Sequence, residues 1–255
     1  MSKNIIKFHS CHPSNNINNL YRPEPVQKHI PKWFLDKDKH AKNPDGTYKI
    51  DFFRNRETDA YEVHRIPSWK SCPAILDIFS SGYYLFTPCD ITFKENLEIE
   101  YDDDWKSIGG SWAFCFPRGE EPDMPTPYGY STQTFAWHPN WFMEVPKGYT
   151  VLFTHPMNIH ELPFRTMSGF IDASNILTGS GNASFYIQEN WTGTIPAGTP
   201  YAQVIPIKND AWVSEIVDHT NEEILDHRNT KSENYLIGPG ITKYKQLDWL
   251  KKHYK

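Results

Sequence analysis

Residues 196–207, PAGTPYAQVIPI, combine a turn with a strand that holds a glutamine in an otherwise apolar run. Pro196 and Gly198 are typical turn residues, and the aromatic and β-branched side chains after them favour a strand. A buried amide at Gln203 needs hydrogen-bond partners. It either binds a ligand or pairs with a strand edge or a neighbouring turn, and the sequence leaves both open.

The rest of the chain predicts a mainly β core with two extensions. Short β-rich runs separated by Gly, Pro, Asn and Asp indicate a barrel or a sandwich. These runs lie at residues 80–93, 96–101, 111–116, 133–137, 141–146, 149–155, 168–173, 183–189, 193–198 and 201–207. We expect three parts: an irregular N-terminal arm over 1–66, the β core over 67–208 and a helical C-terminal tail over 209–255.

The tail shows helical spacing in two places. Val213, Ile216, Val217, Ile224 and Leu225 recur every three to four residues, which predicts a helix over 211–229. IGPG, at 237–240, interrupts the pattern. The basic end of residues 241–255 predicts a second helix, because cations are favourable near a helix C-terminus.

The composition excludes some classes of binding partner and indicates a cellular compartment. The formal net charge of −5 argues against binding a nucleic-acid backbone. No apolar run approaches the roughly 20 residues that cross a bilayer, and no signal peptide is present. We therefore expect no membrane association and a cytoplasmic location. The four cysteines are widely spaced, which predicts free, buried thiols.

Four segments in a fixed order resemble the motifs of the dUTPase superfamily. They are SSGYYLFTPCDITF (80–93), VPKGYTVLFTHPMN (145–158), SGFIDASNILTGSGNASFYIQEN (168–190) and IPAGTPYAQVIPI (195–207). The third is also similar to the dCTP deaminases. The resemblance implies a dUTPase-like (β-clip) barrel or a jelly-roll-like core. The chain is also similar in composition to a family of marine phages and bacteria, which would place it in a host cytoplasm or a virion.

The resemblance also implies a site. Asp172 takes the position of the family's water-activating Asp, and Gln203 that of a glutamine beside the nucleotide. His155 replaces part of the Arg-Ser-Gly that holds phosphates, with Asn158 and Gly169 nearby in the motifs. If the chain is an enzyme, we expect Asp172 and His155 to be catalytic, and Gln203, Asn158 and Gly169 to bind ligand. Asp172 is otherwise a turn residue.

The departures from the family favour a protein without catalytic activity. Phosphoryl transfer depends on placing and neutralising phosphate charge, and HPMN at 155–158 supplies no arginine for it. The histidines 138, 155 and 160 raise the question of a metal site. A facial triad needs a His-x-Asp or His-x-Glu pair, and the sequence contains none. We expect no metal and no cofactor.

Three functions remain open at this point. The first is a non-catalytic dUTPase-like barrel protein used for assembly or partner binding, plausible for a phage component. The alternative is a nucleotide-acting hydrolase or deaminase with an altered site. The third is a metal-dependent oxygenase on a cupin-like barrel.

The expected partner is another copy of the chain. Family barrels trimerise, so the resemblance implies a homo-oligomer, most simply a trimer, or a subunit of a larger assembly. The arm adds its own reason, because Trp33, Phe34 and Trp69 are aromatic anchors that need a surface to cover. They either pack on a neighbouring subunit or fold back on their own core. A small nucleotide is the one ligand that the family implies.

Overall fold

A computed structural model describes residues 4–10, 21–54, 59–103, 105, 113–120, 124–177, 179, 181–231, 244–246 and 248–255. The chain divides into two compact units. The first consists of residues 1–29, 81–210 and 254–255, and the second of residues 30–80 and 211–253. Most regular structure in the described residues is antiparallel β, which confirms the mainly β fold class.

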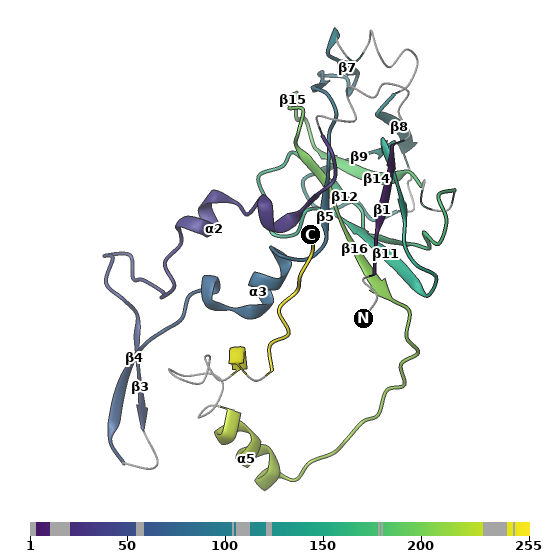
Figure 1. The fold of residues 1–255 in the computed structure, drawn as a ribbon. Coiled ribbons are helices and arrows are strands. Elements are labelled where there is room, and N and C mark those ends of the chain that lie inside the picture. Colours follow the sequence, from purple (N-terminus) through teal and green to yellow (C-terminus); the bar gives the residue numbers. More distant parts are fainter. Residues whose placement is uncertain are drawn as a thin grey trace. The chain divides into compact units, whose positions relative to one another are not determined.

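The first unit contains most of the strands (Figure 1). They are β1 (Lys7–Ser10), β2 (Glu24–Pro25), β5 (Tyr83–Phe86), β6 (Ile91–Phe93), β7 (Ile99–Tyr101), β8 (Cys115–Glu120), β9 (Tyr130–Trp137), β10 (Trp141–Glu144), β11 (Tyr149–Thr154), β12 (Phe164–Thr166), β13 (Gly169–Ile171), β14 (Ala183–Gln188), β15 (Gly193–Ile195) and β16 (Pro200–Lys208). One 3-10 turn, η1 (Val26–Lys28), follows β2.

Two sheets share one hydrophobic core. The five-stranded sheet has the order β13-β11-β16-β5-β2, and the four-stranded sheet has the order β12-β14-β9-β8. Val151 and Val204 of the first sheet and Phe135 and Phe185 of the second belong to the same buried cluster. Trp137 of β9 stacks on Phe185 with ring centroids 3.8 Å apart. Aromatic burial on this scale accounts for most of the core's stabilisation.

The strands do not close into a barrel in the part of the chain that the structure describes. Each of the two large sheets ends in two edge strands; the first unit also contains the smaller sheets β1-β10 and β15-β6-β7, and the sheet β3-β4 belongs to the second unit. The barrel alternative is therefore wrong, whereas the jelly-roll-like alternative stays a prediction, and every predicted β-rich run contains a strand. Alternating side chains predict strands, whereas closure depends on hydrogen bonds between strands that are far apart in sequence.

The N-terminal arm is more regular than its sequence suggests. Strand β1 pairs with β10, and β2 pairs with β5, so residues 4–10 and 21–29 belong to the first unit. The second unit contains the hairpin of β3 (Ile50–Arg54) and β4 (Tyr61–Arg65). The prediction of an irregular arm missed these strands because their pairing partners lie far along the chain or in a short hairpin.

Two short helices in the second unit bury one of the three aromatic anchors. They are α2 (Lys32–Asp36) and α3 (Pro73–Ile78), with the 3-10 turn η2 (Trp69–Ser71) before α3. Phe34 packs on Phe79 with ring centroids 4.5 Å apart, and both are buried. Trp33 and Trp69 remain exposed. Phe34 is therefore buried within the second unit against Phe79, a residue outside the predicted arm, whereas the other two anchors stay exposed.

The longest helix in the described part of the tail begins later than predicted. Helix α5 spans Asn221–Lys231, and residues 211–220 have no regular secondary structure. Thr220 and Glu223 form a capping box: the Glu223 carboxylate accepts the Thr220 backbone N–H at 2.8 Å, and Thr220 Oγ1 accepts the Glu223 N–H at 3.3 Å. These two reciprocal hydrogen bonds start the helix at Asn221. The apolar residues before Thr220 therefore lie outside the helix, although their spacing in the sequence is helical.

The second predicted helix falls partly outside the described residues, at 241–243 and 247. Residues 244–246 are helical, whereas the described residues 248–255 contain no helix, which corrects the C-terminal part of the prediction. Cys89 and Cys115 are free and buried as expected, whereas Cys72 is free and exposed, and Cys11 lies outside the described residues. No helix among the described residues is long and apolar enough to cross a membrane.

Candidate functional site

Polar side chains form a row across one face of the five-stranded sheet. Strand pairing places Glu24 beside Tyr84, Tyr84 beside Gln203, and Gln203 beside Thr154. Residues directly opposite one another on antiparallel strands project to the same face. Thr154 Oγ1 lies 2.7 Å from the hydroxyl of Ser168, which extends the row. The core-facing neighbours Ala202 and Val204 alternate with Gln203, so this row lies on the face away from the main core.

Gln203 is fully buried, and both ends of its amide are hydrogen-bonded to backbone. Its Oε1 accepts the Met157 N–H at 3.0 Å, and its Nε2 donates to the Ser81 carbonyl at 2.8 Å. The amide therefore joins the loop before β5 to the turn after β11. This answers why an apolar strand carries a glutamine: the side chain satisfies two backbone groups of segments that pack over the sheet.

A second, smaller hydrophobic cluster covers the row. It consists of the buried residues Val26, Tyr84, Phe86 and Ile159. The ring of His29 lies 4.9 Å from that of Phe86, and His29 Nε2 lies 2.6 Å from a carboxylate oxygen of Glu24. Residues 21–29 thus cover the sheet face from which a ligand would reach Gln203.

Tyr84 has the one hydroxyl among the buried residues of this cluster. That hydroxyl has no hydrogen-bond partner among the described residues. Burial raises the pKa of Tyr84, because a phenolate would lose its hydration there. The hydroxyl therefore stays protonated. It contributes no negative charge to the row.

His155 uses both ring nitrogens for backbone contacts. The Thr166 N–H donates to Nδ1 at 3.3 Å, so Nδ1 is unprotonated, and Nε2 donates to the Ile159 carbonyl at 3.2 Å. Burial lowers the pKa of His155, with a smaller contribution from the positive charge of Arg165. The ring is a neutral bridge between a turn and β12, and neither nitrogen is free to accept a proton from a substrate.

Asn158 lies in the turn that follows His155. Its φ is +60°, the left-handed region that Asn tolerates better than most residues. The turn is closed by a hydrogen bond from the Ile159 N–H to the Pro156 carbonyl at 3.3 Å. Gly169 begins the edge strand β13 opposite Phe153 and is exposed. The structure therefore groups His155, Asn158 and Gln203 around one turn.

Asp172 is not part of this group. Strand β13 runs antiparallel to β11, with Ile171 beside Val151 and Gly169 beside Phe153. By this register Asp172 is level with Thr150, whereas His155 lies beyond the other end of β11. Five residues of strand separate the two levels, or about 17 Å. Asp172 is exposed, and the structure does not bring it together with His155 in a shared site.

The other histidines and acids do not form a metal centre in the described part of the chain. No group of three or more His, Cys, Asp or Glu residues there is placed to hold a metal ion. His138 is partly buried, which lowers its pKa, and His160 is exposed.

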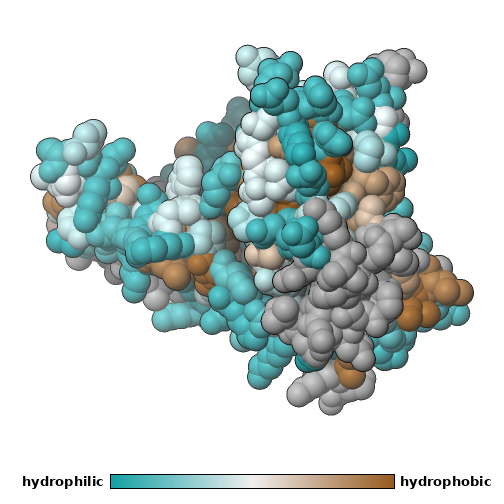
Figure 2. All heavy atoms as spheres, turned by 90° about the horizontal axis from the view of Figure 1, so that it is seen from above, coloured by the Kyte–Doolittle hydropathy of each residue, from teal (hydrophilic) through white to brown (hydrophobic). Residues whose placement is uncertain are grey.

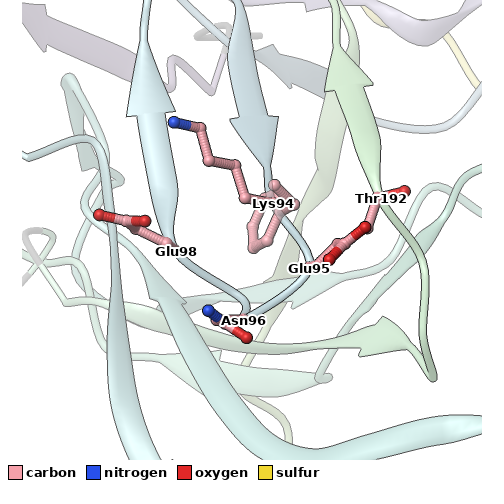
Figure 3. Close-up of a pocket in the computed structure, with 6 residues that line it drawn as sticks. Lys94, Glu95, Asn96, Glu98 and Thr192 are labelled. Atoms are coloured by element: carbon pink, nitrogen blue, oxygen red, sulfur yellow. The ribbon is translucent and has the colours of Figure 1, made fainter.

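A surface hollow lies away from all the predicted site residues (Figure 3). It has a volume of about 460 Å³ and is lined by the turn between β6 and β7 together with Thr192. Figure 3 shows the side chains of Lys94, Glu95 and Glu98 around it. Lys94 is already paired with Glu100 at 2.5 Å. The lining therefore holds one lysine, which is paired with a residue outside the hollow, and two glutamates, and it includes none of the predicted site residues.

Sequence reasoning missed the residues that hold the row in place. Thr166 donates its hydroxyl to the Tyr201 carbonyl at 2.6 Å and its N–H to His155. Trp137 Nε1 donates to Thr166 Oγ1 at 3.0 Å. No local pattern marks these residues, because each partner comes from a different strand.

Comparison with known proteins gives no relative from which to transfer a function: no protein-family model matches the chain, and no curated protein sequence is significantly similar to it.

Proposed function

We propose that the chain is a non-catalytic, self-assembling protein, built on a β core that resembles the dUTPase superfamily. The main support for the proposal is that the candidate catalytic groups are either hydrogen-bonded to backbone or far from one another. The polar side-chain atoms of His155 and Gln203 are hydrogen-bonded to backbone groups, and Asp172 lies at the other end of the β11–β13 pair. A hydrolase needs these groups free and close together.

The surface of the chain supports assembly. Large apolar side chains are exposed in the second unit, among them Trp33, Trp69 and Trp212. The face in Figure 2 shows separate hydrophobic patches within a mainly hydrophilic surface. Apolar surface patches rimmed by polar residues mark interaction sites. Trp is also the residue type most enriched among those that dominate binding energy.

The phosphate chemistry of the resembled family has no support from the described residues. The turn at 155–158 contains no cation, and its one titratable group is a neutral histidine. The nearest row residues are an amide, a hydroxyl and a protonated phenol. Charge neutralisation of a transferring phosphoryl group requires cations or a metal ion.

Three measurements test the proposal. Size-exclusion chromatography with light scattering is expected to show an oligomer at micromolar concentration, and a monomer there would contradict self-assembly. Incubation with dUTP or dCTP is expected to give no pyrophosphate and no deamination. Turnover that is lost in Asp172→Asn would contradict the absence of catalysis. A thermal-shift screen against deoxynucleotides and divalent metals checks for ligands, and a shift with either class would favour the enzyme alternatives.

A further inference from the structure

We propose that Tyr254 and Lys255 form a latch, which docks on the first unit and closes the tail into a loop. The latch is defined as these two residues, its docking site as Gln27 and Tyr83, and the tail loop as residues 211–253. All of the docking contacts lie within one chain, so the latch does not depend on the proposed self-assembly.

The chain leaves the first unit after β16 and returns to it at the latch. Residues 211–253 belong to the second unit, whereas residues 254 and 255 group with residues 81–210 in the first. In Figure 1 the end labelled C lies beside β5, the strand that carries Tyr83. The tail loop is therefore joined to the first unit at both of its ends, through Asp210 and through Tyr254.

Two side chains of the docking site donate hydrogen bonds to the latch backbone. Gln27 Nε2 donates to the Tyr254 carbonyl at 2.8 Å, and the Tyr83 hydroxyl donates to the Lys255 carbonyl at 3.1 Å. Gln27 lies on η1 and Tyr83 on β5, so the donors come from two separate elements. Two donors on two consecutive carbonyls fix the direction of the latch as well as its position.

A ring contact joins the latch to the aromatic side chains of the core. The Tyr254 ring meets the Tyr83 ring edge-on, with centroids 5.8 Å apart and planes at 87°. Tyr83 makes a similar contact with Phe8 of β1, at 5.3 Å and 68°. Both Tyr83 and Phe8 pack against the main core. Edge-to-face pairs are favourable beyond their buried area, so Tyr254 is the principal anchor of the latch.

The exposure of the last described residues agrees with an anchor at Tyr254. Tyr254 is half-buried, whereas residues 250–253 and Lys255 are exposed. Burial raises the pKa of Tyr83, so its hydroxyl stays protonated at neutral pH and remains a donor.

A second anchor holds the tail loop shortly before the latch. Trp249 Nε1 donates to a carboxylate oxygen of Asp77 at 3.1 Å, within the second unit. The exposed residues 250–253 are the stretch between Trp249 and Tyr254. This short segment is held at both ends while the latch is closed and at one end once it opens.

The latch sets how freely the tail loop moves. A chain that is anchored at both ends samples fewer conformations than a chain anchored at one end. Both hydrogen bonds of the latch lie near the surface, so they open at lower cost than contacts of the core. The latch is therefore a conformational switch that tethers the tail loop or releases it.

Trypsin cleavage after Lys251 and Lys252 tests the latch, because cleavage follows the population of the open form. Tyr254→Ala removes the ring contact and is expected to speed this cleavage by about tenfold. Tyr83→Phe removes one hydrogen bond, keeps the ring, and is expected to speed it by about threefold. Tyr128 is fully exposed, and Tyr128→Ala and Tyr128→Phe are the matched controls, with no change expected.

The Tyr83 variant separates opening of the latch from a change in the sequence that the protease recognises. Tyr83 is far along the chain from the cleaved bonds, so its substitution leaves that sequence intact. Cleavage that is as slow in both variants as in the unaltered chain would overturn the latch.

Amine crosslinking shows whether the latch docks on its own chain. Lys28 follows Gln27 and Lys255 follows Tyr254, so a short amine-reactive crosslinker is expected to join Lys28 to Lys255 without altering any side chain of the docking site. Chains with light and heavy isotopes are mixed beforehand, and the joined peptides are expected to carry one isotope only. Joined peptides of mixed isotope, or no such product, would overturn docking within one chain. The product is expected to decrease in Tyr254→Ala.

Discussion

Replacing Gln203 by leucine removes both hydrogen bonds of the buried amide while keeping a side chain of similar size. In the structure, Oε1 accepts the Met157 N–H and Nε2 donates to the Ser81 carbonyl, at 3.0 and 2.8 Å. Losing the two bonds strands two buried backbone groups, the Met157 N–H and the Ser81 carbonyl, at a cost of about 1.5 kcal/mol each. The apolar burial of leucine returns about 1 kcal/mol.

The expected loss in the free energy of unfolding is therefore about 2 kcal/mol, or about a thirtyfold change in the unfolding equilibrium. Urea denaturation followed by tryptophan fluorescence measures it, since Trp137 and Trp141 are buried in the first unit. Gln133→Leu is the matched control, because that amide donates only to the carbonyl of the next residue, at 3.1 Å. Its effect is expected to stay within about 0.5 kcal/mol.

A different result would refute the structural role of Gln203. If Gln203→Leu leaves stability within about 0.5 kcal/mol of the unaltered chain, the two backbone contacts do not hold the loops in place. If it also abolishes a thermal shift caused by a nucleotide, the amide is a ligand-binding group. That outcome would restore the interpretation that the family resemblance suggested.

Two further predictions concern the histidine bridge and the helix start. Burial holds the pKa of His155 below the usual 6.5, so the unfolded chain binds a proton that the folded chain excludes, and stability is expected to fall as pH drops below about 6.5. His155→Gln is expected to flatten this dependence in urea titrations at pH 5 and 7, and an unchanged slope would contradict it. Thr220→Ala is expected to weaken the start of α5 by about 1 kcal/mol, seen as faster hydrogen exchange over residues 221–225, with Thr194→Ala in a distant strand as control.

Local patterns account for the elements of this fold better than for their assembly. The run at 201–207 predicts strand β16 because aromatic and β-branched residues favour strands in any context. The capping box at Thr220 and Glu223 is also local, and attention to it would have placed the helix start correctly. Closure of a barrel, in contrast, requires β13 and β2 to find neighbours, and no short pattern specifies that.

The candidate site, like the fold, was predictable from the sequence only in part. The motifs correctly placed Gln203 and the turn at 155–158 together, because β11 and β16 are adjacent in the sheet. They also suggested that Asp172 joins His155, but the register of β11 with β13 sets the two about 17 Å apart. The order of motifs along a sequence carries no information on which end of a strand a residue occupies, because that depends on the register of strand pairing.

The sequence by itself determined the β-rich class, the turn positions and the lack of a phosphate-binding arginine, since each depends on side-chain type and near neighbours. Only the tertiary structure decided what Gln203 and His155 do. Their partners are the backbone groups of Ser81, Met157 and Thr166, which chain reversal brings together across the sheet. Backbone groups are the same at nearly every residue, so no side-chain pattern predicts which of them a buried amide or imidazole will bind.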